Sequence, residues 1–139
     1  MPQTAHGGKM EWLEDLLVKN EDGSYPVADK LIEVAQTYGF EGWFMNQETE
    51  GTDEEPLTAD HAARMQQFIQ YFKEQAPDLD LVYYDSMTVD GRMDWQNALT
   101  EENLAYLVSE DGEPVADAMF LNFWWTSDLS LIHISEPTR

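Results

Sequence analysis

Residues 39–51 read GFEGWFMNQETEG and carry the strongest structural signal in the chain. An apolar run bounded by glycine is typical of a strand buried on both faces, as in a parallel sheet. Successive side chains of a strand point to opposite faces. One side of this strand is therefore predicted to carry Gly42, Phe44, Asn46 and Glu48.

Asn46 and Glu48 allow two interpretations. Polar residues at the end of a strand can simply mark its exit into solvent. Alternatively, the two residues are neighbours with Cα atoms about 6.5–7 Å apart, at the end of a parallel strand where barrel enzymes keep their catalytic groups. The spacing alone leaves both interpretations open.

Helical patterns flank this strand on both sides. Pro26 suits the first turn of a helix, and Gly39 suits its end. Its apolar face comprises Val27, Leu31, Val34, Ala35 and Tyr38. A second helix is predicted between Thr58 and Pro77. Its buried stripe comprises Met65, Phe68, Ile69 and Phe72.

Strand and helix patterns alternate along the whole chain. Strands are expected at 40–46, 79–85 and 119–123, with a short helix over 10–17. Another short helix, capped by Thr100, is expected to have an apolar face made of Leu104, Leu107 and Val108. This alternation predicts βαβ units and a parallel sheet.

Composition excludes several function classes. The 139 residues include 28 acidic and 7 basic side chains, for a net charge of −21. This charge argues against binding to nucleic acid or anionic membranes and favours a solvated acidic surface. The chain has no cysteine, and its three histidines are isolated, so neither a metal site nor a cofactor is predicted. No apolar stretch approaches the roughly 20 residues of a membrane span, and the first residues do not resemble a signal peptide.

The stretch at 39–51 resembles the catalytic segment of glycoside hydrolase family 85, the endo-β-N-acetylglucosaminidases. That family keeps an Asn-x-Glu pair after a Gly-[Phe/Tyr]-[Asp/Glu]-Gly-[Trp/Tyr] strand. Further segments are also similar to the family: PVADKL at 26–31, YYDS at 83–86 and LNFWW at 121–125. The resemblance extends from about Gly7 to Trp125.

The resemblance implies an α/β fold, namely a partial (β/α)8 TIM barrel that is incomplete at both ends and covers residues 1–128. A complete barrel usually needs about 250 residues. The last residues, 129–139, read LSLIHISEPTR and resemble the translation of a sequencing adapter. We therefore expect that Arg139 is not the natural end of the protein and that His133 has no functional role.

The resemblance also implies a substrate-assisted, retaining hydrolysis of the chitobiose core of N-linked glycans. The acetamido oxygen of the substrate attacks its own anomeric carbon and forms an oxazolinium intermediate. Asn46 is expected to hold the acetamide N–H, and Glu48 is expected to act first as acid and then as base. Tyr84 is expected to lie beside the intermediate, where a phenol can donate a hydrogen bond.

Other residues are expected to bind the substrate, which would be the N-linked glycan of a glycoprotein or glycopeptide. Trp95 and either Trp124 or Trp125 suit the apolar faces of sugar rings. Asn122 could bind a sugar hydroxyl, and Asp85 could orient a neighbour or the substrate. The compartment stays open between a secreted or cell-surface bacterial location and the cytoplasm.

Three alternatives compete with this interpretation. A non-catalytic carbohydrate-binding protein on the same scaffold would have no need of the acid at Glu48. A family 18 chitinase-like enzyme would show an Asp-x-Asp-x-Glu motif, which the sequence lacks. A flavodoxin-type domain would need a glycine-rich turn to hold phosphate, and no such turn is present.

Overall fold

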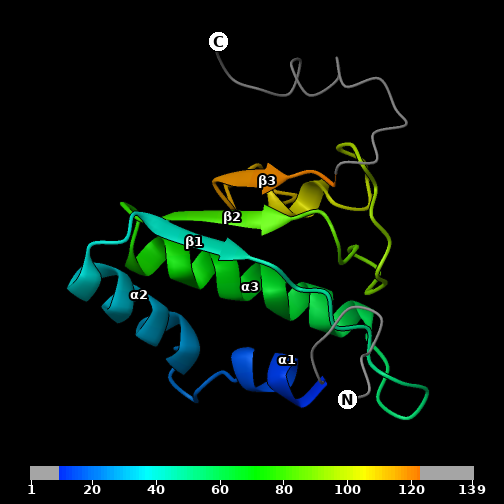
Figure 1. Ribbon diagram of the computed structural model, residues 1–139, viewed down its shortest axis with the longest axis horizontal. Coiled ribbons are helices and arrows are strands. Elements are labelled where there is room, and N and C mark those ends of the chain that lie inside the picture. Colours follow the sequence, from blue (N-terminus) through cyan, green and yellow to red (C-terminus); the bar gives the residue numbers. More distant parts are fainter. Residues whose placement is uncertain (1–9, 123–139) are drawn as a thin grey trace.

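The computed structural model describes residues 10–122, which form a three-stranded parallel sheet with helices against one of its faces (Figure 1). The chain begins with helices α1 and α2, followed by strand β1, helix α3 and strand β2. A long connection containing the 3-10 helix η1 then leads to strand β3. The bounds are α1 Met10–Leu16, α2 Pro26–Tyr38, β1 Gly42–Met45, α3 Ala59–Gln75, β2 Asp80–Tyr84, η1 Leu104–Tyr106 and β3 Ala118–Phe120.

The three strands run in the same direction, so their carboxyl ends meet at one edge of the sheet (Figure 1). Strand β2 is central: Met45 of β1 pairs with Tyr83, and Phe120 of β3 pairs with Tyr84. The prediction of parallel strands in these three places is confirmed, although each strand is shorter than expected. Asn46, Asp85 and Asn122 follow the strands at this shared edge.

Helix α2 begins and ends where its sequence predicts. Pro26 occupies its first turn, and Gly39 follows it with φ 78°, in the left-handed region. The N–H of Gly39 donates to the carbonyl oxygen of Ala35 at 2.8 Å. Because glycine adopts this conformation without strain, the chain can turn directly from the helix into β1.

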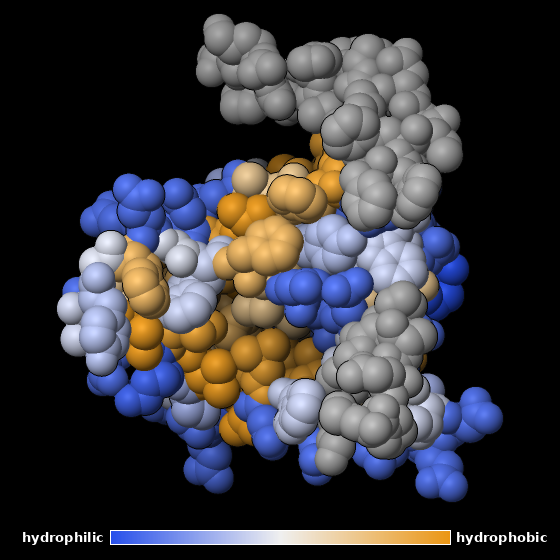
Figure 2. Space-filling view, in the orientation of Figure 1, coloured by the Kyte–Doolittle hydropathy of each residue, from blue (hydrophilic) through white to orange (hydrophobic). Residues whose placement is uncertain are grey.

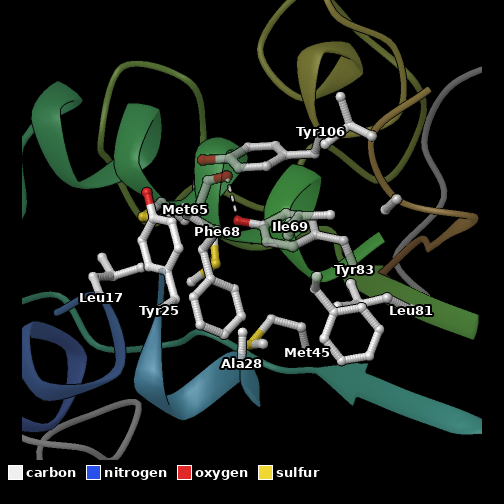
Figure 3. Close-up of a cluster of buried hydrophobic side chains, with 14 of the residues drawn as sticks. Leu17, Tyr25, Ala28, Met45, Met65, Phe68, Ile69, Leu81, Tyr83 and Tyr106 are labelled. Carbon is white, nitrogen blue, oxygen red and sulfur yellow. Dashed lines mark hydrogen bonds between the residues drawn. The ribbon is translucent and has the colours of Figure 1, made fainter. Parts of the chain in front are cut away.

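The core lies between the sheet and α3, with α2 covering its side (Figure 3). The predicted stripe on α3 is fully buried, and Leu81 and Tyr83 of β2 face it. Tyr83 also stacks on Tyr106, with ring centroids 4.0 Å apart. Burial of each large apolar side chain contributes about 1.5–3 kcal/mol. This layer therefore holds the sheet and helices together.

One expectation for β1 is wrong: the strand is not buried on both faces. The side chain of Phe44 is 50% exposed, and Phe120 of β3 is 55% exposed. Among the described residues, helices pack against only one face, and apolar side chains remain at the surface around the strands (Figure 2). We call the uncovered side the open face of the sheet. Three strands do not define a closed barrel, so the TIM barrel stays a prediction.

The connection from β2 to β3 also differs from the expectation. Residues 85–117 contain no α-helix, only the 3-10 helix η1. Thr100 does accept a hydrogen bond from the N–H of Glu102 at 3.0 Å, as a capping residue would. However, the expected apolar face is not buried, since Leu104 and Val108 are each 43% exposed. Tyr106 is the buried side chain here, because its ring stacks on the core.

Some predictions fall outside the described residues. These are the roles of Trp124 and Trp125, the last residue of the predicted third strand, the boundary at residue 128 and the interpretation of residues 129–139. Within residues 10–122, no helix is long and apolar enough to cross a membrane.

Candidate functional site

The alternation of β1 continues beyond its last paired residue. Met45, Gln47 and Thr49 are buried, whereas Asn46 is exposed and Glu48 is half-buried. Gln47 stabilises this extension by folding back on the chain: its Nε2 donates to the Thr49 carbonyl oxygen at 2.9 Å, and its Oε1 accepts from the Thr49 N–H at 3.0 Å. With alternate residues held inside, the side chains of Asn46 and Glu48 stay on the open face.

A concavity of about 520 Å³ lies on this open face. Its lining residues come from all three strands and their extensions: Phe44, Asn46, Glu48, Tyr84 and Phe120. The fold thus brings together Asn46, Glu48 and Tyr84, the three residues expected to be catalytic. Burial of Glu48 is incomplete within the described residues, because the second face of the sheet is uncovered.

Aromatic rings form the apolar wall of this concavity. The ring centroids of Phe44 and Phe120 are 5.5 Å apart in an edge-to-face arrangement. Phe44 and Tyr84 are 6.0 Å apart, and Tyr84 and Phe120 are 6.1 Å apart. Exposed rings grouped in this way offer a surface suited to the apolar faces of a sugar. The sequence singled out Tyr84 but assigned no site role to Phe44 or Phe120, because apolar residues in a strand are usually core.

Tyr84 is the polar centre of the site. Its hydroxyl donates a hydrogen bond to Oδ1 of Asn122 at 2.8 Å. Partial burial raises the pKa of Tyr84, and the nearby carboxylates of Glu48 and Asp85 raise it further; a hydrogen bond with the Trp95 side chain opposes them. Tyr84 is therefore a neutral phenol at physiological pH, in contact with Trp95 and Asn122.

Asp85 lies behind the concavity and is almost completely buried, with 1% of its surface exposed. Its Oδ1 accepts from the N–H of Gln96 and from Nδ2 of Asn103, both at 3.1 Å. Its Oδ2 accepts from the N–H groups of Asn97 at 2.7 Å and Asn122 at 3.3 Å. Both oxygens of Asp85 are thus used on groups inside the protein, and the two roles expected for it stay predictions.

The amide of Asn122 is also used internally. Besides accepting from Tyr84, its Nδ2 donates to Oδ1 of Asn97 at 2.7 Å, and only 7% of the residue is exposed. Because an amide has two N–H donors and two lone pairs on its oxygen, these bonds leave the expected contact with a sugar hydroxyl possible, and that contact stays a prediction. Trp95 is half-buried, and its side chain has a hydrogen bond with Tyr84.

Two residues of the site were missed by sequence reasoning. Oγ of Ser86 donates to the Gln47 carbonyl oxygen at 2.5 Å and so ties the end of β2 to the end of β1. Asn97 has φ 61° and accepts the hydrogen bond from Asn122. A serine next to a strand end and an asparagine in a loop are common, and nothing local distinguishes them. Within residues 10–122, no group of three or more His, Asp or Glu side chains is arranged to hold a metal ion.

A parallel α/β sheet whose strand ends carry an acid, an amide and a phenol around one concavity fits a glycoside hydrolase. The family comparison identifies which one: residues 2–135 match the model of glycosyl hydrolase family 85, and the chain belongs to this family. The resemblance inferred from the residues 39–51 is thereby confirmed.

Individual relatives agree with this assignment. The chain is 32% identical over 122 residues to cytosolic endo-beta-N-acetylglucosaminidase 2 of Arabidopsis thaliana, a match that covers 85% of this chain and 15% of that protein. It is 28% identical over 126 residues to the human cytosolic endo-beta-N-acetylglucosaminidase, covering 88% and 15%. The solved glycoside hydrolase domain of Endo-D from Streptococcus pneumoniae matches with a TM-score of 0.73 and 34% identity, covering 83% of this chain and 18% of that one. The chain thus spans about 15% of the length of the curated relatives it matches.

Proposed function

We propose that this chain carries the catalytic acid and the acetamide-orienting amide of an endo-β-N-acetylglucosaminidase. The substrate would be an N-linked glycan, cut between the two N-acetylglucosamine residues of its core. The observation that carries the proposal is that Asn46, Glu48 and Tyr84 of a family 85 chain line one concavity. The names of the relatives support the same activity.

The two polar residues that follow β1, Asn46 and Glu48, have different tasks in the proposed reaction. An amide cannot act as nucleophile or base, so the nucleophile has to come from the substrate, whose acetamido oxygen attacks the anomeric carbon. Asn46 accepts the hydrogen bond of the acetamide N–H and so orients this group. Glu48 protonates the departing sugar oxygen and then takes a proton from the incoming water. Two displacements at one carbon retain its configuration.

The surrounding residues would bind and orient the sugar. The rings of Phe44, Tyr84 and Phe120 are available to its apolar faces, and Trp95, which has a hydrogen bond with Tyr84, adds another. The roles of Trp124 and Trp125 remain proposals based on the family resemblance. The word "cytosolic" in the names of the plant and animal relatives favours the cytoplasm over export for this protein.

A chimera tests the proposed activity. Residues 10–122 would replace the matching part of the solved Endo-D domain, which supplies the rest of a catalytic domain. Mass analysis of a digested N-glycopeptide should then find one N-acetylglucosamine left on the peptide. Release of the glycan with none left would refute the proposed cleavage site. Binding of the glycopeptide without turnover would support the alternative of a carbohydrate-binding protein.

Substitutions in the same chimera test the roles of the two residues. Glu48→Gln should lower kcat about 10²–10⁴-fold, the usual size of acid–base assistance. Asn46→Ala should also reduce hydrolysis strongly, because the acetamide would lose its orienting partner. Glu54→Gln, the same chemical change in the exposed loop beyond the site, is the matched control. Wild-type turnover in Asn46→Ala would contradict a substrate-assisted reaction.

A further inference from the structure

The hydrogen bonds around Tyr84 form a chain whose direction is determined by a single carbonyl group. Nδ2 of Asn97 lies 3.1 Å from the carbonyl oxygen of Trp95. A carbonyl oxygen can only accept a hydrogen bond, so the amide nitrogen of Asn97 must face it. The side-chain oxygen of Asn97 is therefore turned the other way, toward Asn122.

The same reasoning determines the orientation of the Asn122 amide and, through it, the direction of the Tyr84 hydroxyl. The amide group of Asn122 that meets Oδ1 of Asn97, at 2.7 Å, has to be its NH₂ group. Its oxygen is then left facing Tyr84, at 2.8 Å from the phenol oxygen. An amide oxygen cannot donate, so the hydrogen of the phenol must point at Asn122.

The backbone keeps this chain in place. Asp85 accepts from the N–H groups of both Asn97 and Asn122, and it is buried. Asn97 has φ 61°, a conformation that asparagine tolerates better than most residues other than glycine. Neither side-chain amide can flip without breaking the hydrogen bond at its nitrogen and the hydrogen bond at its oxygen.

We propose that Asn97 and Asn122 are positioning residues that turn the hydroxyl hydrogen of Tyr84 into the protein and leave its oxygen to face the open site as a hydrogen-bond acceptor. The phenol oxygen keeps a second lone pair beside the hydrogen bond that it accepts from the Trp95 side chain. Tyr84 then accepts a hydrogen bond from a donor of the ligand, such as a sugar hydroxyl, in place of the donor role expected from the sequence. This role deepens the proposed function and rests on it, whereas the direction of the hydrogen bonds does not depend on any activity.

The direction can be measured without substrate. Replacing Tyr84 of the 139-residue chain by 3,5-difluorotyrosine lowers its pKa toward neutrality and provides a 19F signal that follows its ionisation. Asn122→Leu removes the facing amide at similar volume. If the amide oxygen faces the phenol, it disfavours the phenolate, and its loss lowers the pKa of residue 84 by about 0.4 to 1. A rise in this pKa would mean that the NH₂ group faces the phenol and would overturn the proposal.

A second variant acts from a distance. Asn97→Gly suits the left-handed backbone and does not touch Tyr84, but it frees the amide of Asn122 to turn its NH₂ group toward a phenolate. The pKa of residue 84 should fall in this variant as well. Gln96→Ala removes a side chain from the same loop while keeping the backbone N–H that binds Asp85, and should leave the pKa unchanged. An unchanged pKa in Asn97→Gly would overturn the positioning role.

The catalytic part of the inference has its own readout. In the Endo-D chimera, Asn97→Gly should lower kcat more than it changes KM, because a misdirected hydroxyl still occupies the site. If the pKa values change as expected while the unsubstituted chimera has no activity, the hydrogen-bond chain stands and the proposed function fails. If the chimera is active and neither pKa nor kcat responds, the proposed function stands and this inference fails.

Discussion

At the scale of the residue, Gly42 shows how closely the first two strands approach each other. A Cβ atom added at this position would lie 2.1 Å from the backbone oxygen of Asp80, its partner in β2. Backbone atoms of a paired strand cannot move aside as the end of a flexible side chain can. Gly42 therefore allows β1 to pair with β2 in the register that carries Asn46 and Glu48 to the open face.

Gly42→Ala should consequently destabilise the chain by about 1–3 kcal/mol, the usual cost of inserting an atom into packed structure. Urea unfolding followed by circular dichroism measures this change. Glu41→Ala is a suitable control, since Glu41 is the exposed neighbour and contributes to the pairing through its carbonyl oxygen alone. If the urea midpoints of Gly42→Ala and the wild type were equal, the two strands could move apart without loss of stability, and this prediction would be wrong.

At the scale of the element, an ion-pair cluster fastens α1 to the start of α3. Oε1 of Glu14 lies 3.0 Å from Nη1 of Arg64, and its Oε2 lies 2.6 Å from Nε2 of His61. On its other side, Nδ1 of His61 accepts from the N–H of Thr58 at 3.1 Å, which caps α3. No role for His61 follows from the sequence, and the fold makes it a structural link between α1 and α3.

This cluster predicts a pH dependence of stability. The hydrogen bond from Arg64, with further help from His61, lowers the pKa of Glu14 below its ordinary value of 4.5 although partial burial opposes the change. A lowered native pKa means that the unfolded state binds more protons, so the contribution is present above pH 4.5 and is lost as pH falls through the native value. Since Glu14 is 45% exposed, the contribution is at most about 1 kcal/mol.

Glu14→Gln should therefore lower the melting temperature at pH 7 and have little further effect at pH 3. Thermal melts between pH 3 and 7 measure the difference from the wild type. Glu11→Gln removes the same charge from an exposed position of α1 and controls for net charge. A difference in melting temperature between Glu14→Gln and the wild type that stays the same at all pH values would contradict the assigned ion pair.

At the scale of the whole molecule, the open face of the sheet determines the stability and solubility that we expect of the isolated chain. A parallel sheet is normally covered on both faces, yet Phe44 and Phe120 are about half exposed here. The large negative charge favours solubility but covers no apolar surface. We therefore expect the isolated 139-residue chain to be marginally stable, prone to aggregation and without measurable glycosidase activity.

Substitutions on the open face test this expectation. Replacing both Phe44 and Phe120 by threonine should raise the fraction of monomer, measured by size-exclusion chromatography with light scattering, while the chain keeps its fold. Phe68→Thr is the contrasting control, because Phe68 is fully buried against the sheet and its loss should unfold the chain. A wild-type chain that melts sharply as a monomer and hydrolyses glycopeptide would contradict the expectation.

Much of this architecture is determined by local patterns in the sequence. The proline and glycine that bound α2, the apolar stripe of α3 and the apolar runs of the strands depend on residues near one another, so periodicity alone predicts them. The same is true of Asn46 and Glu48, because the alternation of an extended chain places residues two apart on the same side. The family followed from motifs that are likewise contiguous.

The remaining features of the fold and of the site depend on contacts between residues far apart in the chain, so only the tertiary structure decided them. The residues next to Gly42 do not reveal that the backbone of Asp80 will lie against it. The residues next to Asn97 do not reveal that its side-chain oxygen will accept a hydrogen bond from Asn122. The apolar pattern of β1 predicted burial, but a pattern records only which side chains are apolar, not whether a second layer covers them. The two site residues that follow β1 can therefore be predicted from the local sequence. The direction proposed for the Tyr84 hydroxyl cannot, because it depends on Asn97 in a distant loop and on Asn122 beyond the end of β3.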